Sequence, residues 1–280
     1  MKIGFIDYYL DEWHANNYPE LISTASNGAH TISCAYAHSE PPAEMNLRSN
    51  AQWSADYGIE LVDSIEEVIE RSDCLIVLSP DNPEMHEVLC QLPLASGKPT
   101  YTDKTFAPDK ATAERIFAHA EKHNTPCFSS SALRFSSELD EIDITGIQKI
   151  YSEGPGLLSF YSIHQIEPIV RLMNCRARRV MFLGNETHPS YMIEFEDGRL
   201  VQCYHRDIPG RTFVITTVDK ENKATQHQIK SKFFALFVDA MVRFFETGKA
   251  PVTHEQTIDV IAIRSTVIEA CKTPYVWFDL

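Results

Sequence analysis

The stretch Asp73–Ala107, DCLIVLSPDNPEMHEVLCQLPLASGKPTYTDKTFA, predicts a strand, a helix and a short second strand that delivers a lysine at its end. A short apolar run followed by helical periodicity is typical of a β-α-β unit. In an open parallel sheet, ligands bind at the carboxyl ends of the strands. We therefore expect Lys104 and His86 to lie where chemistry takes place.

The rest of the first half repeats this alternation, which indicates a doubly wound parallel sheet with crossover helices. We expect strands at 3–6, 31–36, 74–78, 100–102 and 127–129, and helices at 14–26, 64–71, 83–95 and 108–123. Asp63 or Ser64 is placed to cap the second helix, Gly97 to end the third and Pro108 to occupy the first turn of the fourth.

After Ser131 the pattern changes to period-two alternation separated by turn signals, which favours an antiparallel meander. We expect a connecting helix at 133–141, strands at 179–183, 191–195, 200–204 and 212–218, and helices at 231–247 and 254–271. The predicted fold class is α/β, with a Rossmann-like, doubly wound parallel sheet in residues 1–130 and an α+β domain with a mostly antiparallel open sheet in residues 131–280. Such pairs of domains usually place the active site in the crevice between them.

Composition excludes several classes of partner. The net charge of -14 disfavours nucleic acid and anionic membrane surfaces, which require a clustered basic face. The chain runs from Met1 directly into a strand pattern, and no apolar run reaches the ~18 residues of a membrane span, so we expect a cytoplasmic protein. Seven scattered cysteines without a CxxC pair indicate reduced thiols rather than disulfides or a zinc site.

Two motifs support a narrower assignment. DSIEEVIERSDCLIVLSPDNPEMHEVLCQLPLASGKPTYTDKTFA, at 63–107, has a strand, a proline and histidine signature, and a turn of Asp103, Lys104 and Thr105. GPGLLSFYSIHQIEPIVRLM, at 154–173, is a glycine-rich approach to a helix that carries His164. Both resemble the Gfo/Idh/MocA oxidoreductase family, named for glucose-fructose oxidoreductase and inositol dehydrogenase, and the resemblance spans nearly the whole chain in motif order.

The resemblance implies a dehydrogenase that uses NAD or NADP to oxidise a sugar, a polyol or a related hydroxyl compound. By motif position, Lys104 lies beside the hydroxyl that is oxidised and His164 acts as proton shuttle. Glu167, three residues later on the same helical face, is placed to orient the imidazole. Phe160 replaces the aspartate of the family motif, so Tyr161, Gln165 or Glu167 has to compensate for the lost carboxylate.

The turn after the first strand departs from the family. Asp7, Tyr9 and Glu12 stand where three glycines would let the backbone approach a diphosphate. Their side chains oppose the usual pose of a dinucleotide, and the carboxylates place negative charge at a helix N-terminus. Asp11 either adds to that charge or caps the helix, and His14 in the first turn either lines the crevice or is exposed.

Further residues are candidates for the binding sites. At the end of the second strand, His38 and Ser39 replace the usual acidic residue, which favours NADP over NAD. Arg134 follows a strand end and binds an anionic group, or else pairs with Glu138 on the next turn. The predicted cofactor contacts are Asp7, Tyr9, His14, His38, Ser39, Pro80, His86, Asp103 and Arg134. The predicted substrate contacts are Tyr161, Gln165, Tyr204 and Arg206, with His205 facing opposite to its two neighbours.

Two classes of function remain open. The first is the nicotinamide-dependent oxidoreductase, with Lys104, His164 and Glu167 as catalytic residues; a lyase, epimerase or glycosidase that uses hydride transfer transiently belongs with it. The second is a ligand-binding or regulatory protein on the same fold that has lost dinucleotide binding. In both we expect a small-molecule partner and a dimer formed through the open sheet. No metal site is predicted, since His164, Glu167, His188 and His205 are too scattered to expect convergence.

Overall fold

The computed structural model describes residues 1–185, 187–206 and 212–280. They form two compact units, one of residues 1–130 and 238–254, the other of residues 131–237 and 255–280. The sequence assigned all of 131–280 to the second domain, whereas residues 238–254 pack with the first unit. Within that unit the Phe244 ring, on helix α8 (Phe233–Thr247), packs edge-on against Phe128 with ring centroids 4.8 Å apart.

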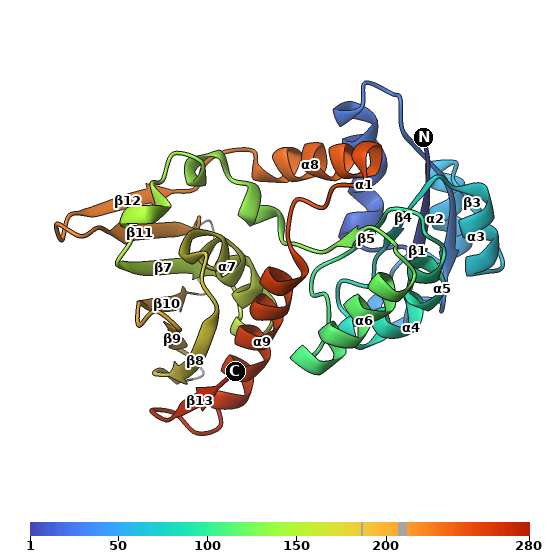
Figure 1. The fold of residues 1–280 in the computed structure, drawn as a ribbon. Coiled ribbons are helices and arrows are strands. Elements are labelled where there is room, and N and C mark those ends of the chain that lie inside the picture. The colour runs from blue at the N-terminus through green and yellow to red at the C-terminus, as the bar shows by residue number, and fades with distance from the viewer. Residues whose placement is uncertain (186, 207–211) are drawn as a thin grey trace. The chain divides into compact units, whose positions relative to one another are not determined.

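The first unit contains a six-stranded, wholly parallel sheet with the order β3-β2-β1-β4-β5-β6 (Figure 1). Its strands are β1 (Lys2–Asp7), β2 (Thr31–Ala37), β3 (Glu60–Leu61), β4 (Cys74–Val77), β5 (Thr100–Thr102) and β6 (Cys127–Phe128). Its helices are α1 (Trp13–Ala25), α2 (Asn50–Tyr57), α3 (Ile65–Arg71), α4 (His86–Leu89), α5 (Gln91–Ala95) and α6 (Lys110–Lys122). The predicted doubly wound sheet is confirmed, and this strand order is that of dinucleotide-binding folds.

The central strands β1 and β4 are almost wholly buried because helices cover both faces of the sheet. This explains why they read as continuous apolar runs. The predicted single helix at 83–95 is instead a 3₁₀ turn (Pro83–Met85) followed by α4 and α5. Pro93 lacks the N–H that would bond to the carbonyl of Leu89, which removes one helical hydrogen bond across the junction of α4 and α5. Ser64 caps α3 as predicted, whereas Asp109 caps α6 and leaves Pro108 outside that helix.

The second unit contains a sheet of order β12-β11-β7-β10-β9-β8-β13, in which only the β7–β10 pair is parallel. Its strands are β7 (Lys149–Pro155), β8 (Ala177–Phe182), β9 (Ser190–Phe195), β10 (Leu200–Arg206), β11 (Val214–Val218), β12 (Ala224–Gln228) and β13 (Trp277–Asp279). Helix α7 (Leu158–Met173) lies against β7 and β10, and α9 (His254–Ala270) follows α8 in the chain. The mostly antiparallel sheet is confirmed.

Alternation of buried and partly exposed residues along β7 to β11 shows that one face of this sheet is covered more fully than the other. The sequence did not single out β7, β12 or β13 as strands. The connecting helix predicted at 133–141 is instead two 3₁₀ turns, Ala132–Phe135 and Ser137–Leu139. Between them the Ser136 hydroxyl donates to the Leu133 carbonyl at 2.7 Å, and such local side-chain bonds compete with a continuous α-helix.

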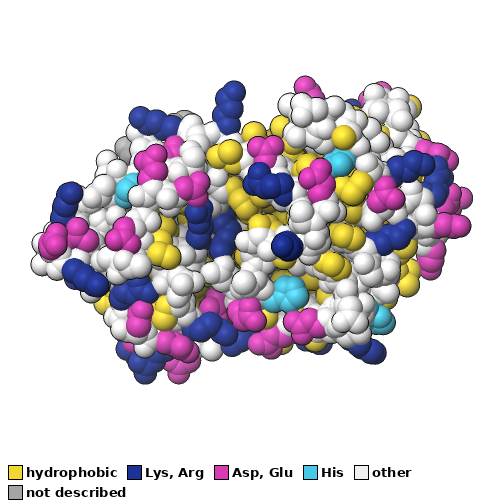
Figure 2. All heavy atoms as spheres, turned by 45° about the horizontal axis from the view of Figure 1, so that its top comes forward, with side chains coloured by type: hydrophobic (Ala, Val, Ile, Leu, Met, Phe, Trp, Pro, Cys, Tyr) yellow, Lys and Arg dark blue, Asp and Glu magenta, His cyan; other side chains and the backbone are white. Residues whose placement is uncertain are grey.

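None of the seven cysteines forms a disulfide, and five of them are buried. None of the described helices combines the length and apolar character needed to cross a bilayer. On the face drawn in Figure 2, lysine and arginine side chains are scattered among acidic ones rather than gathered into one basic area.

Candidate active site

Glu12 caps helix α1 with its own side chain. Its carboxylate accepts the backbone N–H of His14 at 2.6 Å and the backbone N–H of Ala15. The prediction that Asp11 caps this helix is therefore wrong. Asp11 instead binds Arg48, accepting its backbone N–H at 2.7 Å and its guanidinium at 2.6 Å. Both carboxylates are engaged within the chain, and Glu12 holds the first amides of the helix.

A cluster of ionisable groups surrounds this cap at the carboxyl ends of β1 and β5. Nδ1 of His14 lies 3.1 Å from the Glu12 carboxylate and 3.3 Å from the Asp103 carboxylate. Tyr101 donates its hydroxyl to Asp103 at 2.8 Å. Asp7 is 1 % exposed and accepts the backbone N–H of Tyr8. The structure thus brings together Asp7, His14 and Asp103, three of the predicted cofactor contacts, as one buried cluster in the first unit.

The pKa values of two members of this cluster shift in the same direction. Burial, reinforced by the negative charge of Glu12, raises the pKa of Asp7 well above its ordinary value. Burial lowers the pKa of His14, but the carboxylates of Asp103 and Glu12 outweigh it, so the net pKa is raised. His14 is therefore a largely buried residue whose charged form is favoured by the carboxylates of Asp103 and Glu12.

The implied dinucleotide does not fit this turn in the usual pose. A diphosphate at the start of a Rossmann helix rests on the free N–H groups of its first turn. In α1 those of His14 and Ala15 are held by Glu12. The hollow beside Asp7, Tyr9, Glu12 and Pro80 has about 0 Å³ of space for a water-sized molecule, against roughly 300–1,000 Å³ for small-molecule pockets. Both space and charge exclude a diphosphate here.

The remaining first-unit candidates divide into accessible and inaccessible residues. His38 is exposed and stacks on Tyr8, with ring centroids 5.8 Å apart, while Ser39 and Pro80 are partly exposed. Tyr9 is 6 % exposed, and its hydroxyl points to the sulfur of Met45 at 3.8 Å. His38, Ser39 and Pro80 therefore remain open to a ligand, whereas Tyr9 is largely covered.

His86 is wholly buried and holds two backbone segments together. Its Nδ1 lies 2.9 Å from the Thr105 carbonyl and 3.1 Å from that of Phe106, and its Nε2 lies 2.7 Å from that of Leu78. Both ring nitrogens are occupied and no surface is left for a ligand. The predicted contact of His86 with a cofactor is corrected to a structural role, because the ring fixes the loop that carries Lys104.

Lys104 lies directly after β5, at the carboxyl edge of the first unit's sheet, as the sequence predicts. It is partly exposed, and its positive charge is near enough to His14 to lower the pKa of that imidazole. Its ammonium thus stands at the edge of the buried carboxylate cluster. A partly desolvated lysine at such an edge is suited to proton transfer.

In the second unit, Ser131 links His164 to Glu167. The Ser131 hydroxyl lies 2.6 Å from Nδ1 of His164, and its backbone N–H donates to the Glu167 carboxylate at 3.1 Å. Glu167 also pairs with Arg134 at 3.2 Å, and both charges are buried. The alternative partner of Arg134, Glu138, is wrong, since Glu138 accepts hydrogen bonds from Lys230 and Ser231 instead. Arg134 is therefore a buried partner of Glu167 rather than an open anion contact.

The predicted substrate contacts also differ in their exposure. Tyr161 is 43 % exposed, and its ring meets that of His164 edge-on, with centroids 5.3 Å apart. Tyr204 and Arg206 are partly exposed and stack, the guanidinium lying 5.1 Å from the ring centroid, while His205 is buried on the opposite face as predicted. Gln165 is 1 % exposed and bonded to Ser152 at 2.8 Å, so its predicted contact with substrate is corrected to a structural one.

Sequence reasoning missed Ser131, Tyr101 and the capping role of Glu12. The serine run at 129–131 directly after a strand was a usable signal for the first, because strand ends carry functional side chains. Tyr101 and Glu12 gave no local signal, since their roles depend on which buried carboxylate or helix amide lies opposite. Among the described residues, no three histidine, cysteine, aspartate or glutamate side chains are placed to hold a metal ion.

No protein-family model and no curated protein sequence matches this chain. Solved structures do. GenD2 from gentamicin A biosynthesis, in complex with NAD, is similar with a TM-score of 0.78 at 10% identity over 100% of this chain and 96% of that one. The scyllo-inositol dehydrogenase of Lactobacillus casei, with bound NAD(H) and scyllo-inositol, has a TM-score of 0.78 at 15% identity over 99% and 98%. A probable dehydrogenase from Thermotoga maritima has a TM-score of 0.79 at 12% identity over 100% and 98%. The chain therefore shares the fold of these three proteins.

Proposed function

We propose that this protein is an oxidoreductase that acts on a hydroxyl group of a sugar, a polyol or a related compound. The observation that carries the proposal is Lys104, a partly exposed ammonium at the carboxyl end of a central parallel strand, beside the buried carboxylate of Asp103 and the imidazole of His14. Ligands of this sheet type bind at that edge. The shared fold with sugar and inositol dehydrogenases supports the same class of reaction.

The chain's own residues supply the proton chemistry. Oxidation of a hydroxyl group releases a proton, and a positioned lysine or histidine accepts it. Lys104 fits this role once its ammonium has lost a proton: the neutral amine accepts the hydroxyl proton as hydride leaves the carbon for the electron acceptor, and the nearby carboxylates of Glu12 and Asp103 stabilise the ammonium that forms again. We propose His164 as the second acid-base group, because the Ser131 hydroxyl fixes the orientation of its ring at 2.6 Å.

A nicotinamide dinucleotide is the electron acceptor that the fold suggests, and Glu12 opposes its usual placement. We propose that a dinucleotide binds only when the Glu12 carboxylate leaves the first amides of α1. His38 and Ser39, at the end of β2, present no carboxylate to a 2'-phosphate, which favours NADP on charge alone.

One specific observation favours a second candidate function. The two amides that would hold a diphosphate are bonded to Glu12, as expected of a ligand-binding or regulatory protein that no longer uses a dinucleotide. The two candidates differ in one measurable property, the affinity of the whole protein for NADH and NADPH.

The separating experiment titrates the protein with each nucleotide while following fluorescence and thermal unfolding. Binding stabilises the folded state by about 2.7 kcal/mol at a hundredfold excess over the dissociation constant. A response to either nucleotide supports the oxidoreductase and identifies the preferred form, and no response to both leaves the second candidate. For a responding protein, Lys104→Ala should lower turnover by about 10²–10⁴-fold with little change in nucleotide affinity. Unchanged turnover removes Lys104 from the reaction.

A further inference from the structure

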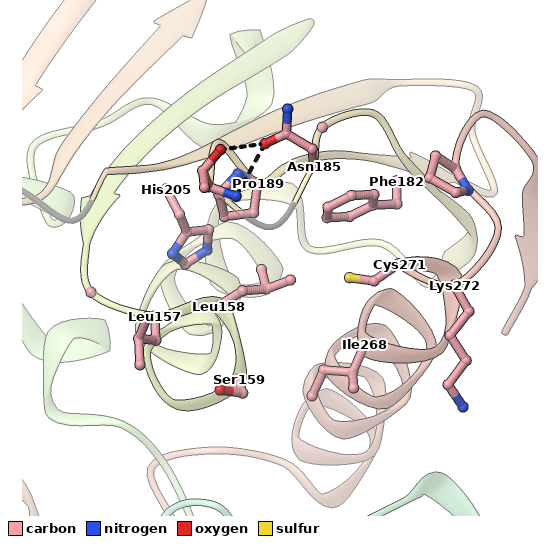
Figure 3. A pocket seen from close by; sticks show the side chains of 14 residues that line it. Leu157, Leu158, Ser159, Phe182, Asn185, Pro189, His205, Ile268, Cys271 and Lys272 are labelled. Atoms are coloured by element: carbon pink, nitrogen blue, oxygen red, sulfur yellow. Dashed lines mark hydrogen bonds between the residues drawn. The ribbon is translucent and has the colours of Figure 1, made fainter.

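A cavity of about 580 Å³ lies within the second unit, distinct from the residues discussed above except His205 (Figure 3). The start of α7, the ends of β8 and β10, and the end of α9 contribute to its wall. Its apolar wall consists of Leu157, Leu158, Phe182, Pro189, Ile268 and Pro274. This volume is in the range of small-molecule sites.

The N-terminus of α7 opens on this cavity without a cap. The N-cap residue is Leu157, whose side chain cannot accept a hydrogen bond, and no other side chain of the described residues caps the helix. The first N–H groups of a helix have no partner within it, and here they belong to Leu158 and Ser159, both in the cavity wall. The two residues that carry these donors, at the positive end of the helix dipole, therefore line the cavity.

Gly156 is what brings these amides to the wall. Its φ of +83° is strained for any residue with a Cβ, and a Cβ there would lie 2.4 Å from the ring of Tyr161. The chain therefore turns just before the helix begins, at the place where Leu157, Leu158 and Ser159 enter the cavity wall.

His205 supplies a further donor, and its tautomer follows from its neighbours. Ser152 donates its hydroxyl to Oε1 of Gln165 at 2.8 Å, which leaves the Gln165 amide nitrogen, 3.1 Å from Nε2 of His205, as the donor of that pair. Nε2 must then accept, so the proton of the neutral ring sits on Nδ1. Burial lowers the pKa of His205 to about 4, in agreement with a neutral ring.

Nδ1 of His205 has no hydrogen-bond partner among the described residues, although the ring is 1 % exposed and lines the cavity. The backbone of Gly156 raises the pKa of His205 and partly offsets the effect of burial. An unused buried N–H is costly, by about 1–3 kcal/mol. A ligand acceptor in the cavity relieves that cost.

We propose that this cavity is a binding site for a small amphipathic carboxylate, with the carboxylate against the amides of Leu158 and Ser159 and Nδ1 of His205, and the apolar part against Phe182 and Ile268. The donors at the start of α7 and on the neutral His205 ring favour an anion. The rim cation, Lys272, is already paired with Glu269 at 2.7 Å, so a single negative charge suits the site better than a phosphate dianion. The inference is independent of the dinucleotide.

Three probes of equal chain length test the ligand class on the whole protein: octanoate, octan-1-ol and octylammonium. Calorimetric titration should give a saturable site for octanoate, and at least about tenfold weaker binding of the other two, since a hydrogen bond to a charged group contributes roughly 1.5–3 kcal/mol. Equal affinity for octanoate and octylammonium, or no binding of octanoate, would overturn the proposal.

Two pairs of variants test the place. Leu158→Pro removes one of the free N–H groups at a helix position where proline is tolerated, and Leu158→Ala removes the same side chain but keeps the N–H. Octanoate should bind the proline variant about tenfold more weakly than the alanine variant, by the value of one such hydrogen bond. Ile268→Trp should fill the cavity and abolish binding, whereas Val88→Trp, on an exposed surface of the first unit, should not. Equal affinities within either pair would contradict the assigned site.

Discussion

The N-termini of α1 and α7 both carry backbone N–H groups without a partner inside the helix, but the two ends differ in whether a side chain caps them. In α1 the chain's own Glu12 carboxylate takes the amides of His14 and Ala15. In α7 the N-cap is Leu157, no side chain among the described residues caps the helix, and Leu158 and Ser159 line a cavity of about 580 Å³. One side chain at the cap position decides whether a helix end is satisfied internally or is available to an anion.

The comparison also shows that the helix end without a cap is not the one at which the fold predicts an anion site. The fold leads one to expect it at α1, after the first strand of the parallel sheet. In this chain that end carries a buried carboxylate and no space, whereas the open helix end lies in the second unit. Fold alone is therefore a poor guide to where this protein binds a negative group.

The largest effect on anion affinity is expected from removing the Glu12 carboxylate that caps α1. Glu12→Gly removes the competing carboxylate and frees two amides, so the affinity for inorganic pyrophosphate and for NADH should rise about 10- to 100-fold, the value of one hydrogen bond to a charged group. The loss of stability should be small, because glycine is a fair N-cap. Calorimetric titration measures the gain. Glu12→Gln separates charge from bulk, and Glu20→Gln, exposed on the same helix, is the matched control. An unchanged affinity in Glu12→Gly would show that Glu12 does not compete with the anion.

The converse change gives the N-terminus of α7 a capping side chain. Leu157 is 59 % exposed, so Leu157→Asp loses little burial and supplies a carboxylate cap. Octanoate affinity should fall at least about tenfold, while the free energy of unfolding rises by about 1 kcal/mol from the new cap. Leu157→Asn, an uncharged cap, should give a similar gain in stability with a smaller loss of affinity. A variant that is stabilised but binds octanoate unchanged would place the anion elsewhere.

A smaller effect is expected on the pH dependence of stability at the α1 end, where Asp7 and His14 are buried. The pKa of Asp7 is raised in the folded state, so the stability that its proton provides is present at acid pH and is lost as the pH rises through the folded value. The raised pKa of His14 acts in the same direction above its ordinary value of about 6.5. Asp7→Asn should therefore be more stable than the wild type near pH 7 by about 1–3 kcal/mol, the range for an unfavourably buried polar group. Urea unfolding between pH 5 and 8 measures this, and parallel curves for the two proteins would contradict it.

The sequence predicted what depends on local periodicity. The parallel sheet, the position of Lys104 and the alternation around His205 all follow from runs of residues that report their own burial. The wrong predictions concern side chains whose hydrogen-bond or ion-pair partner lies far away in the sequence. Glu12 rather than Asp11 caps α1 because Arg48 takes Asp11, and Arg134 pairs with Glu167 rather than Glu138 because both are buried together. Nothing within a few residues of either position carries that information.

The most direct test follows the backbone amides of both helix ends by NMR in the wild-type protein, with pyrophosphate and octanoate added separately. Octanoate should shift the amide signals of Leu158 and Ser159, and pyrophosphate should leave those of His14 and Ala15 in place, because Glu12 already holds them. Pyrophosphate shifts at His14 and Ala15, with no octanoate response at Leu158 and Ser159, would contradict the account of one closed and one open helix end.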